Sequence, residues 1–191
     1  MSVKWNAFFP RVMPEVKGCP APIVVQAIRD AAREFCERTW VWQEVVPFQM
    51  DEGMREIFIA SPRGSRLVSV RHLIEDNREV DFPDDIFVRS DREMDKLRME
   101  SSETKQSSVR AVFKPSEDAD SCPDFLYNDH AEAISYGAKY RLLSNPSKPW
   151  GMPEMAMVHL QMFRKSIAQV KIYLRKGYTG KSLKVKPRRF V

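Results

Sequence analysis

The spacing of apolar residues changes twice along this chain, and each change restricts the fold. From residue 21 to 40 apolar side chains recur every third or fourth position, then every second position in short runs between 41 and 115, then every third or fourth again. The first spacing is typical of an amphipathic helix and the second of a strand with one buried face. The sequence therefore predicts an α+β fold in which a β-rich segment interrupts a helical one.

The first helical segment, residues 21–40, has a distinct apolar face. Pro22 suits a first turn, where its missing N–H costs no hydrogen bond. Residues 1–20 contain three prolines and are expected to form an irregular arm with one short helical turn. The expected apolar face of the helix comprises Val24, Ala27, Ile28, Ala31, Phe35 and Cys36.

Residues 41–115 are expected to form a small, mostly antiparallel β domain. Apolar, β-branched and aromatic runs at 41–48, 54–60, 66–74 and 108–114 are separated by turn signals at 51–53, 61–64 and 75–77. Residues 90–107 are expected to form a short exposed helix or a mobile loop, because positions 91–100 carry seven charged side chains and few apolar ones. Strict alternation puts Val68, Val70, His72 and Ile74 on one face of the third run, and Val109, Ala111 and Phe113 on one face of the last.

Helical spacing returns over residues 121–143. Ser121 or Asp124 could cap this helix, with Pro123 in its first turn. Gly137 lowers helix propensity by about 1 kcal/mol, so its presence indicates a close approach to another helix that a larger residue would block. The expected buried face comprises Tyr127, Ala131, Ile134, Ala138 and Leu142.

The last helix is expected to begin near Pro153 and to end before Gly177. Its apolar positions are spaced alternately by four and three, a heptad pattern suited to near-antiparallel bundle packing: Ala156, Leu160, Phe163, Ile167, Val170 and Leu174. Its polar face carries Gln161, Arg164, Lys165, Lys171 and Arg175.

The simplest domain organisation follows from these elements. Residues 1–20 form an N-terminal arm, residues 21–40 and 116–176 an antiparallel helical bundle, and residues 41–115 the inserted β domain. Residues 177–191 form an extended basic tail. The N-terminus lacks the continuous apolar stretch of a signal peptide, and three cysteines without a CxxC pair suit a reducing cytoplasm.

The sequence lacks the motifs of common enzyme classes. It has no GxxxxGK[ST], GxGxxG, GxSxG or HExxH, so no catalytic, cofactor-binding or metal-binding residue is predicted and no cofactor is expected. His72 is interpreted as a packed or half-exposed strand residue. His130 and His159 could pair between facing helices, but a satisfied polar contact is the favoured interpretation of each. The carboxylate pairs Asp84/Asp85, Asp118/Asp120 and Asp124/Asp129 fall in loops or at helix starts, where Asp serves turns and caps.

Cysteines and methionines are interpreted mainly as structural. Cys36 lies on an apolar helix face and is expected to be buried, whereas Cys19 could be exposed. The methionines in or near the last helix are interpreted as core residues, with an adaptable protein-binding surface as the alternative: Met152, Met155, Met157 and Met162.

The C-terminal tail is the feature that folding explains least. The net charge of the chain is +5, and residues 177–191 alone carry five basic and no acidic side chains, so the preceding body is neutral. Apolar and basic residues alternate along the tail, as in a strand that joins the edge of another protein's sheet. Docking of the tail onto another chain is favoured over nucleic-acid contact and over a merely solubilising role.

Three blocks of the sequence together resemble the head-to-tail adaptor proteins of tailed bacteriophages. They are residues 14–42, residues 123–150, and the long last helix followed by GYTGKSLKVKPRRF at 177–190. The resemblance implies a structural virion protein, not an enzyme, that forms a ring of about twelve copies beneath the portal, with head-to-tail interfaces that close. It also implies a place at the head–tail junction of the virion, after assembly in the host cytoplasm.

The resemblance implies partners as well. They are the portal protein, further copies of the chain, a downstream tail protein (nozzle, tube or stopper), and genomic DNA that passes through the ring without sequence-specific contact. The expected portal-binding residues are those of the tail: Leu183, Lys184, Val185, Lys186, Pro187, Arg188, Arg189, Phe190 and Val191. The alternative function is a nucleic-acid-binding protein that acts through the same basic tail.

Overall fold

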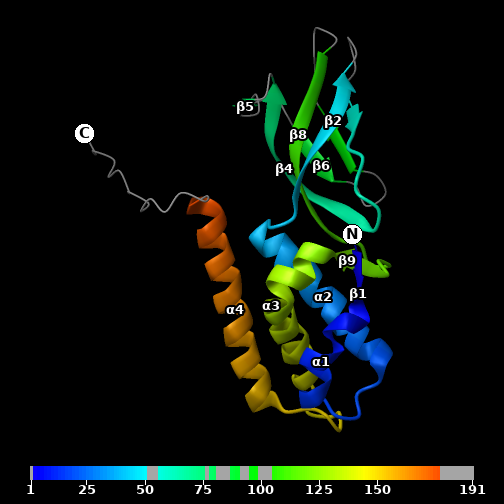
Figure 1. Cartoon of the computed structure of the whole chain (residues 1–191), viewed down its shortest axis with the longest axis vertical. Helices are drawn as coiled ribbons and strands as arrows, with labels where there is room; N and C mark the ends of the chain where they lie inside the picture. The colour runs from blue at the N-terminus through cyan, green and yellow to red at the C-terminus, as the bar shows by residue number, and fades with distance from the viewer. Residues whose placement is uncertain are drawn as a thin grey trace, which may run out of the picture.

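The structure is a computed structural model that describes residues 2–50, 56–75, 78–80, 87–90, 95–98 and 105–176. Over these residues the fold is mixed α+β, as the sequence predicts, with helices and antiparallel sheets. The helices occupy one end of an elongated molecule and the larger sheets the other end (Figure 1). The prediction of a mixed α+β fold with antiparallel sheets is therefore confirmed.

Three long helices lie side by side: α2 (Ala21–Thr39), α3 (Asp124–Leu143) and α4 (Pro153–Lys176). Helix α3 packs against both α2 and α4 (Figure 1). All six residues of the expected apolar face of α2 are buried. Ser121 does not cap α3, because strand β9 (Ser121–Pro123) occupies this segment and Pro123, expected in the first turn, holds the cap position. Asp124 is the first helical residue, and its carboxylate accepts a hydrogen bond of 3.0 Å from the Phe125 N–H.

Gly137 sits where α3 comes closest to its neighbours. A methyl group built at its Cα would lie 3.0 Å from the Ala31 side chain of α2 and 3.0 Å from the Phe163 ring of α4. The predicted close approach of helices at this glycine is confirmed, and both neighbouring helices take part in it.

The N-terminal arm is more ordered than the sequence suggested. It runs through β1 (Ser2–Lys4), a 3-10 turn η1 (Trp5–Phe8), α1 (Phe9–Val12) and a second 3-10 turn η2 (Met13–Glu15). Strand β1 pairs with β9, and the indole Nε1 of Trp5 donates a hydrogen bond of 2.7 Å to the carbonyl of Ala119. The arm is thereby fixed to the start of α3 and contributes to the core.

Antiparallel sheets form the inserted segment. One has the order β2 (Gln43–Met50), β8 (Lys105–Pro115), β4 (Ser65–Glu75) and β5 (Arg78–Val80), and another the order β3 (Glu56–Phe58), β7 (Asp95–Arg98) and β6 (Phe87–Ser90). Strands β2, β3, β4 and β8 match the four predicted runs. The helix or loop expected over 90–107 is wrong wherever the structure describes this segment, because β7 covers 95–98, β8 begins at Lys105 and β6 ends at Ser90. Residues 91–94 and 99–104 lie outside the described residues.

Strand β4 departs from strict alternation. Its buried residues are Leu67, Val70 and Leu73, spaced by three, whereas the expected face of Val68, Val70, His72 and Ile74 is only partly buried. The register against β8 shifts between Leu67 and Ser69 and again between Val70 and His72. Each irregularity inserts a residue and moves the following side chains to the other face. The expected buried face of β8, with Val109, Ala111 and Phe113, is confirmed.

One hydrophobic core runs through both ends of the molecule. Trp42, just after α2, connects them, because its ring lies 6.1 Å from Phe113 of β8 and 6.4 Å from Phe125 of α3, measured between ring centroids. The Phe113 N–H also donates a hydrogen bond of 2.8 Å to the Trp42 carbonyl. The sheet is thus inserted in the chain between α2 and α3 but shares its core with the helices.

Candidate binding surface along helix α4

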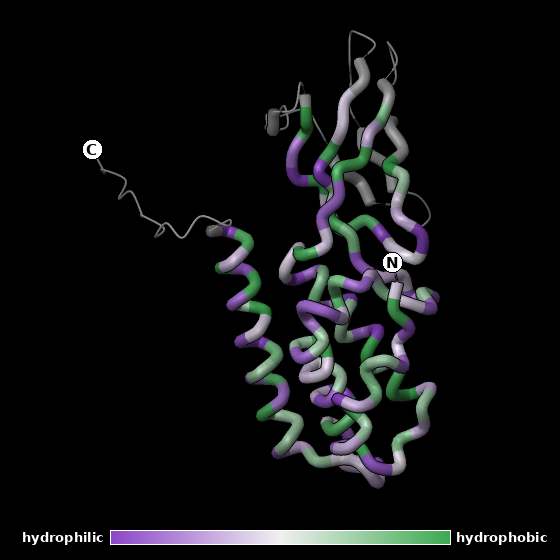
Figure 2. The backbone as a smooth tube through the Cα atoms, viewed as in Figure 1, coloured by the Kyte–Doolittle hydropathy of each residue, from purple (hydrophilic) through white to green (hydrophobic). Residues whose placement is uncertain are grey.

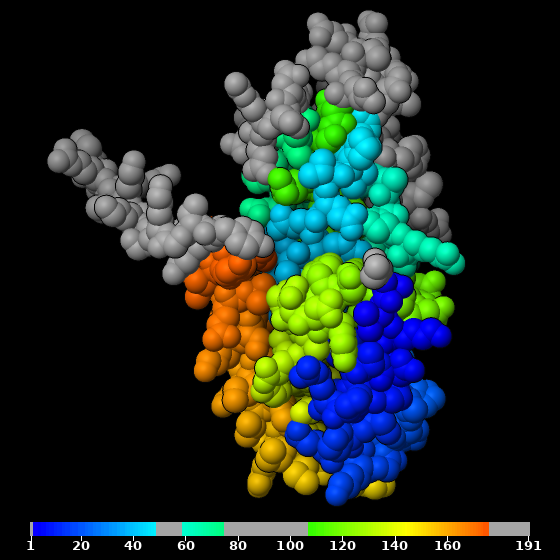
Figure 3. Space-filling model, viewed as in Figure 1, coloured from blue at the N-terminus to red at the C-terminus, as the bar shows by residue number. Residues whose placement is uncertain are grey.

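Helix α4 forms one edge of the molecule and is covered on one side only. Figure 3 shows it as a column beside α3, and Figure 2 shows hydrophobic and hydrophilic residues alternating along its whole length. Ala156, His159, Phe163 and Ile167 face inward and are buried. A second set of large apolar side chains, at or next to the helix, is exposed: Met152, Met155, Met157, Val158, Met162, Ile172, Tyr173 and Leu174.

The interpretation of the methionines as core residues is therefore wrong. Met152 and Met157 are each 53% exposed, and Met155 and Met162 about 40%, because they lie away from the inner face of α4. The helix has more apolar residues than its single contact face can cover. An exposed, flexible methionine stripe is typical of a surface that adapts to a protein partner.

The expected seam of α4 ends before the helix does. Leu160 and Val170 are partly buried, but Leu174 is 36% exposed. The last turns of α4 stand off the body of the molecule, and two clefts lie beside them. The sequence pattern alone continues through Leu174 and gives no sign of this separation.

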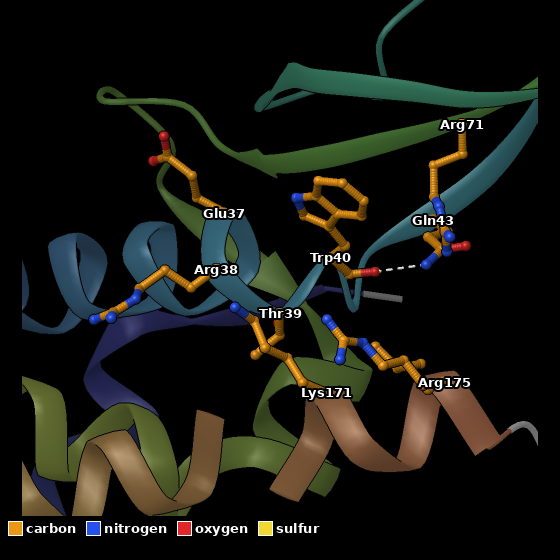
Figure 4. Close-up of a pocket in the computed structure, with 9 residues that line it drawn as sticks. Glu37, Arg38, Thr39, Trp40, Gln43, Arg71, Lys171 and Arg175 are labelled. Atoms are coloured by element: carbon orange, nitrogen blue, oxygen red, sulfur yellow. Dashed lines mark hydrogen bonds between the residues drawn. The ribbon is translucent and has the colours of Figure 1, made fainter. Parts of the chain in front are cut away.

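The first cleft, of about 590 Å³, lies between the end of α2, strand β4 and the end of α4. Figure 4 shows Lys171 and Arg175 rising from α4 towards the end of α2, while Arg71 extends from β4. The residues around the cleft are predominantly polar or basic: Glu37, Arg38, Thr39, Trp40, Gln43, Arg71, Lys171, Leu174 and Arg175. We call this the basic cleft.

Two of the charged side chains at the basic cleft already have partners. Arg38 pairs with Glu34 at 2.8 Å, and Glu37 pairs with Lys114 at 2.9 Å. Burial raises the pKa of Glu34, but hydrogen bonds from Arg141 and Arg38 outweigh it and hold that pKa below its usual value. Among the described residues, Arg71, Lys171 and Arg175 form no ion pair, so no described carboxylate compensates these three positive charges.

Trp40 gives the basic cleft an aromatic wall. It follows the last residue of α2 with a φ of 60°, a left-handed conformation that a bulky residue rarely adopts. Gln43 Nε2 donates a hydrogen bond of 2.7 Å to the Trp40 carbonyl (Figure 4). The Arg71 guanidinium lies 5.4 Å from the centre of the Trp40 ring. The indole is 40% exposed, and strained residues of this kind cluster at functional sites.

The second cleft, of about 680 Å³, lies on the side of α4 that faces α3 and is more apolar. It shares Leu174 with the basic cleft. His130 lines it with a pKa that burial lowers, partly offset by Asp129. The full lining is Val41, Phe125, Asp129, His130, Gln169, Val170, Tyr173 and Leu174. We call this the apolar cleft.

The other end of α4 is held by a partly buried charge cluster, in which Glu15 is exposed and its two partners are buried. Glu15 of η2 bridges Lys139 of α3 and His159 of α4, with the His159 Nε2 atom 2.6 Å from its carboxylate. Lys139 and His159 are 8% and 6% exposed, and the His159 ring stacks on Tyr136. His130 instead packs against Phe35 and Phe125, so the alternative in which His130 pairs with His159 is wrong. The favoured interpretation, a satisfied polar contact, is confirmed for His159.

Removing the charge of Glu15 should make the fold less stable and less sensitive to acid. Burial raises the pKa of Glu15, but Lys139 and His159 outweigh it and hold that pKa below its ordinary 4.5. The carboxylate therefore stabilises the fold above pH 4.5 and loses this effect as pH falls through the lowered pKa. At pH 7 we expect Glu15→Gln to reduce the unfolding free energy by about 1 kcal/mol, because the Lys139 ammonium loses its charged partner while solvent around the 39% exposed carboxylate weakens the attraction.

Urea unfolding at pH 7 and at successive pH values below 4.5 would measure both effects. Wild-type stability should fall faster with acidity than that of the variant. Glu154→Gln, which removes an exposed carboxylate at the start of α4, is the matched control and should leave both quantities nearly unchanged. Equal acid sensitivity of wild type and Glu15→Gln would show that Glu15 makes no special contribution.

The other candidate residues from the sequence do not converge. Asp118 and Asp120 are exposed on a loop, Asp124 and Asp129 lie at the start of α3, and Asp84 and Asp85 lie outside the described residues. In the described parts of the chain, no group of histidine, cysteine and carboxylate side chains could hold a metal ion. His72 is half-buried in β4, as interpreted.

All three cysteines are buried. Cys36 is buried as expected, but the exposure suggested for Cys19 is wrong, since only 5% of it is accessible. Burial raises the pKa of all three thiols, that of Cys122 to about 12. Neutral thiols without access to solvent are poor nucleophiles, so none of them suits a catalytic role.

The expected portal-binding residues, 183–191, lie outside the described residues, as does the whole tail from 177. Sequence reasoning identified Lys171 and Arg175 as part of a basic helix face, but it missed Glu15, Trp40 and Arg71. Nothing in the local sequence signals them, because each meets its partners through long-range packing.

The chain matches no protein-family model and no curated protein. Among the described helices, none has the length and apolar character needed to cross a lipid bilayer. The candidate site therefore rests on the geometry of α4 and its two clefts.

Proposed function

We propose that this protein is a structural virion component, a head-to-tail adaptor that forms a ring under the portal and joins the capsid to the tail. The observation that carries the proposal is the exposed apolar surface of α4, which includes Met155, Val158 and Met162. A protein that acts alone rarely leaves so many large apolar side chains in water on one helix. A subunit that assembles covers them against its neighbours.

The position of the tail supports the same proposal. Helix α4 ends at Lys176, and the sequence continues directly into the alternating apolar and basic residues of 177–191. In the proposed ring, α4 contributes to the wall between subunits and the tail residues from Leu183 to Val191 bind the portal. The ring extends the channel for genomic DNA and offers its other end to the next tail protein, without a cofactor or a catalytic step.

Light scattering of the protein alone and mixed with the portal ring from the same genome tests this function. We expect a small species alone and a large stoichiometric complex with the portal. A variant that lacks residues 181–191 should keep its fold but fail to form the complex. A wild-type protein unchanged by the portal, or a truncated protein that still assembles on it, would contradict the proposal.

Two matched tail variants separate portal docking from the alternative of nucleic-acid binding. In one, Leu183, Val185 and Phe190 are changed to serine; in the other, Lys184, Lys186 and Arg188 are changed to glutamine. Docking in portal grooves predicts that the serine variant forms little or no complex with the portal. Nucleic-acid binding instead predicts that only the glutamine variant loses affinity for duplex DNA, and that the wild-type affinity falls steeply with salt.

A further inference from the structure

The two clefts beside the end of α4 lie next to each other but differ in chemistry. The basic cleft presents Arg71, Lys171 and Arg175, none of them paired among the described residues, and the exposed face of Trp40. The apolar cleft presents Val41, Phe125 and Tyr173 among others. Leu174 belongs to both, so the clefts adjoin at a single side chain.

We propose that these clefts together form a docking site for an acidic peptide segment that carries one bulky apolar side chain. Its carboxylates would pair with Arg71, Lys171 and Arg175, and its apolar side chain would enter the apolar cleft across Leu174. The segment belongs to a protein partner, and the inference rests on the clefts alone, not on ring formation or on the tail.

Charge complementarity argues for carboxylates. Three cations that have no counter-charge in the described part of the chain come from two elements, β4 and α4, and approach one opening (Figure 4). Bringing them together costs repulsion that an anionic ligand relieves, and guanidinium groups bind carboxylates with two parallel hydrogen bonds. Glu37 and Arg38 do not change this balance, because each already has a partner of opposite charge.

The apolar cleft distinguishes a peptide from a nucleic acid. A phosphate backbone would satisfy the cations equally well, but its sugars and phosphates would leave an apolar cleft of about 680 Å³ unfilled. A peptide places carboxylates and an aliphatic or aromatic side chain within a few residues of each other. Recognition by one apolar anchor within a charged rim is the usual pattern of peptide-binding sites.

Fluorescence anisotropy with three labelled, end-capped peptides tests the proposal. The first has a phenylalanine flanked on both sides by glutamates, the second has glutamines in place of the glutamates, and the third has serine in place of the phenylalanine. We expect the first peptide to bind the full chain about tenfold more tightly than either of the others, since it alone fills both clefts.

A matched pair of variants places the binding in the clefts. Arg71→Gln with Arg175→Gln should weaken binding of the first peptide about tenfold, whereas Arg164→Gln with Lys165→Gln, on the exposed surface of α4 outside the cleft lining, should change it less than about twofold. Both variants lose the same charge and keep the same basic tail. Circular dichroism checks that both remain folded.

Three outcomes would overturn the proposal. The glutamine or serine peptide could bind as tightly as the first peptide, or the two variants could lose equal affinity. A DNA duplex could also bind more tightly than the first peptide and lose affinity with Arg71→Gln and Arg175→Gln, which would make the clefts a nucleic-acid site. Because the portal is absent from this assay, none of these outcomes depends on the adaptor function.

Discussion

Gly137→Leu is expected to reduce the unfolding free energy by about 3 kcal/mol or more, since a side chain at this position has no space. Even a methyl group would lie 3.0 Å from Ala31 and 3.0 Å from the fully buried ring of Phe163. A leucine would force α3 away from both α2 and α4. Urea unfolding followed by far-ultraviolet circular dichroism measures the loss.

Two controls define the cause of the Gly137→Leu effect. Gly137→Ala should leave the unfolding free energy nearly unchanged, because the gain of about 1 kcal/mol in helix propensity is offset by the close contacts of the added methyl group. Ala168→Leu, which adds the same side chain to an exposed position of α4, should change stability by less than about 0.5 kcal/mol. A mild effect of Gly137→Leu, similar to that of Ala168→Leu, would show that the helices can separate without cost.

The local elements of the fold could be predicted because their patterns are short-range. The apolar face of α2 follows from a spacing of three and four, and Gly137 signals a close contact because a mid-helix glycine lowers helix stability. Neither inference requires knowledge of a distant residue. The same holds for β8, whose alternating Val109, Ala111 and Phe113 are buried as the spacing predicts.

The predictions that were wrong concern features that depend on contacts between distant parts of the chain. The two irregularities in β4 arise from its pairing with β8 and shift its buried face to Leu67, Val70 and Leu73. Strand β7 forms within a strongly charged segment because β3 and β6 pair with it on both sides. Strand pairing therefore outweighs the local preference of the sequence at these places.

The candidate site was hidden for the same reason. Glu15 meets His159 across 144 positions of the sequence, and Trp40 meets Arg71 only because β4 returns to the end of α2. The methionines of α4 have the composition of a core, and only the position of the helix at the edge of the molecule exposes them. Composition identifies the apolar residues that could form a core, but tertiary packing determines which of them face solvent.

Phe163 and Met162 are neighbours on α4, but their substitution should change the unfolding free energy by very different amounts. Phe163 is 1% exposed and contacts Phe35 of α2, with ring centroids 6.3 Å apart, so Phe163→Ala should reduce the unfolding free energy by about 3–5 kcal/mol. Met162 is 41% exposed, so Met162→Ala should change it by less than about 0.5 kcal/mol. Urea unfolding of both variants under the same conditions measures the difference.

The exposed face should instead determine assembly. Changing Met155, Val158 and Met162 together to glutamine keeps good helix formers and leaves the inner face of α4 intact. We expect this triple variant to unfold like the wild type but to form no complex with the portal ring in light scattering. Normal assembly would show that the apolar surface of α4 is not an interface between subunits and would remove the main support for the adaptor proposal. Loss of assembly without loss of stability would mean that α4 uses one face to fold and the other to associate.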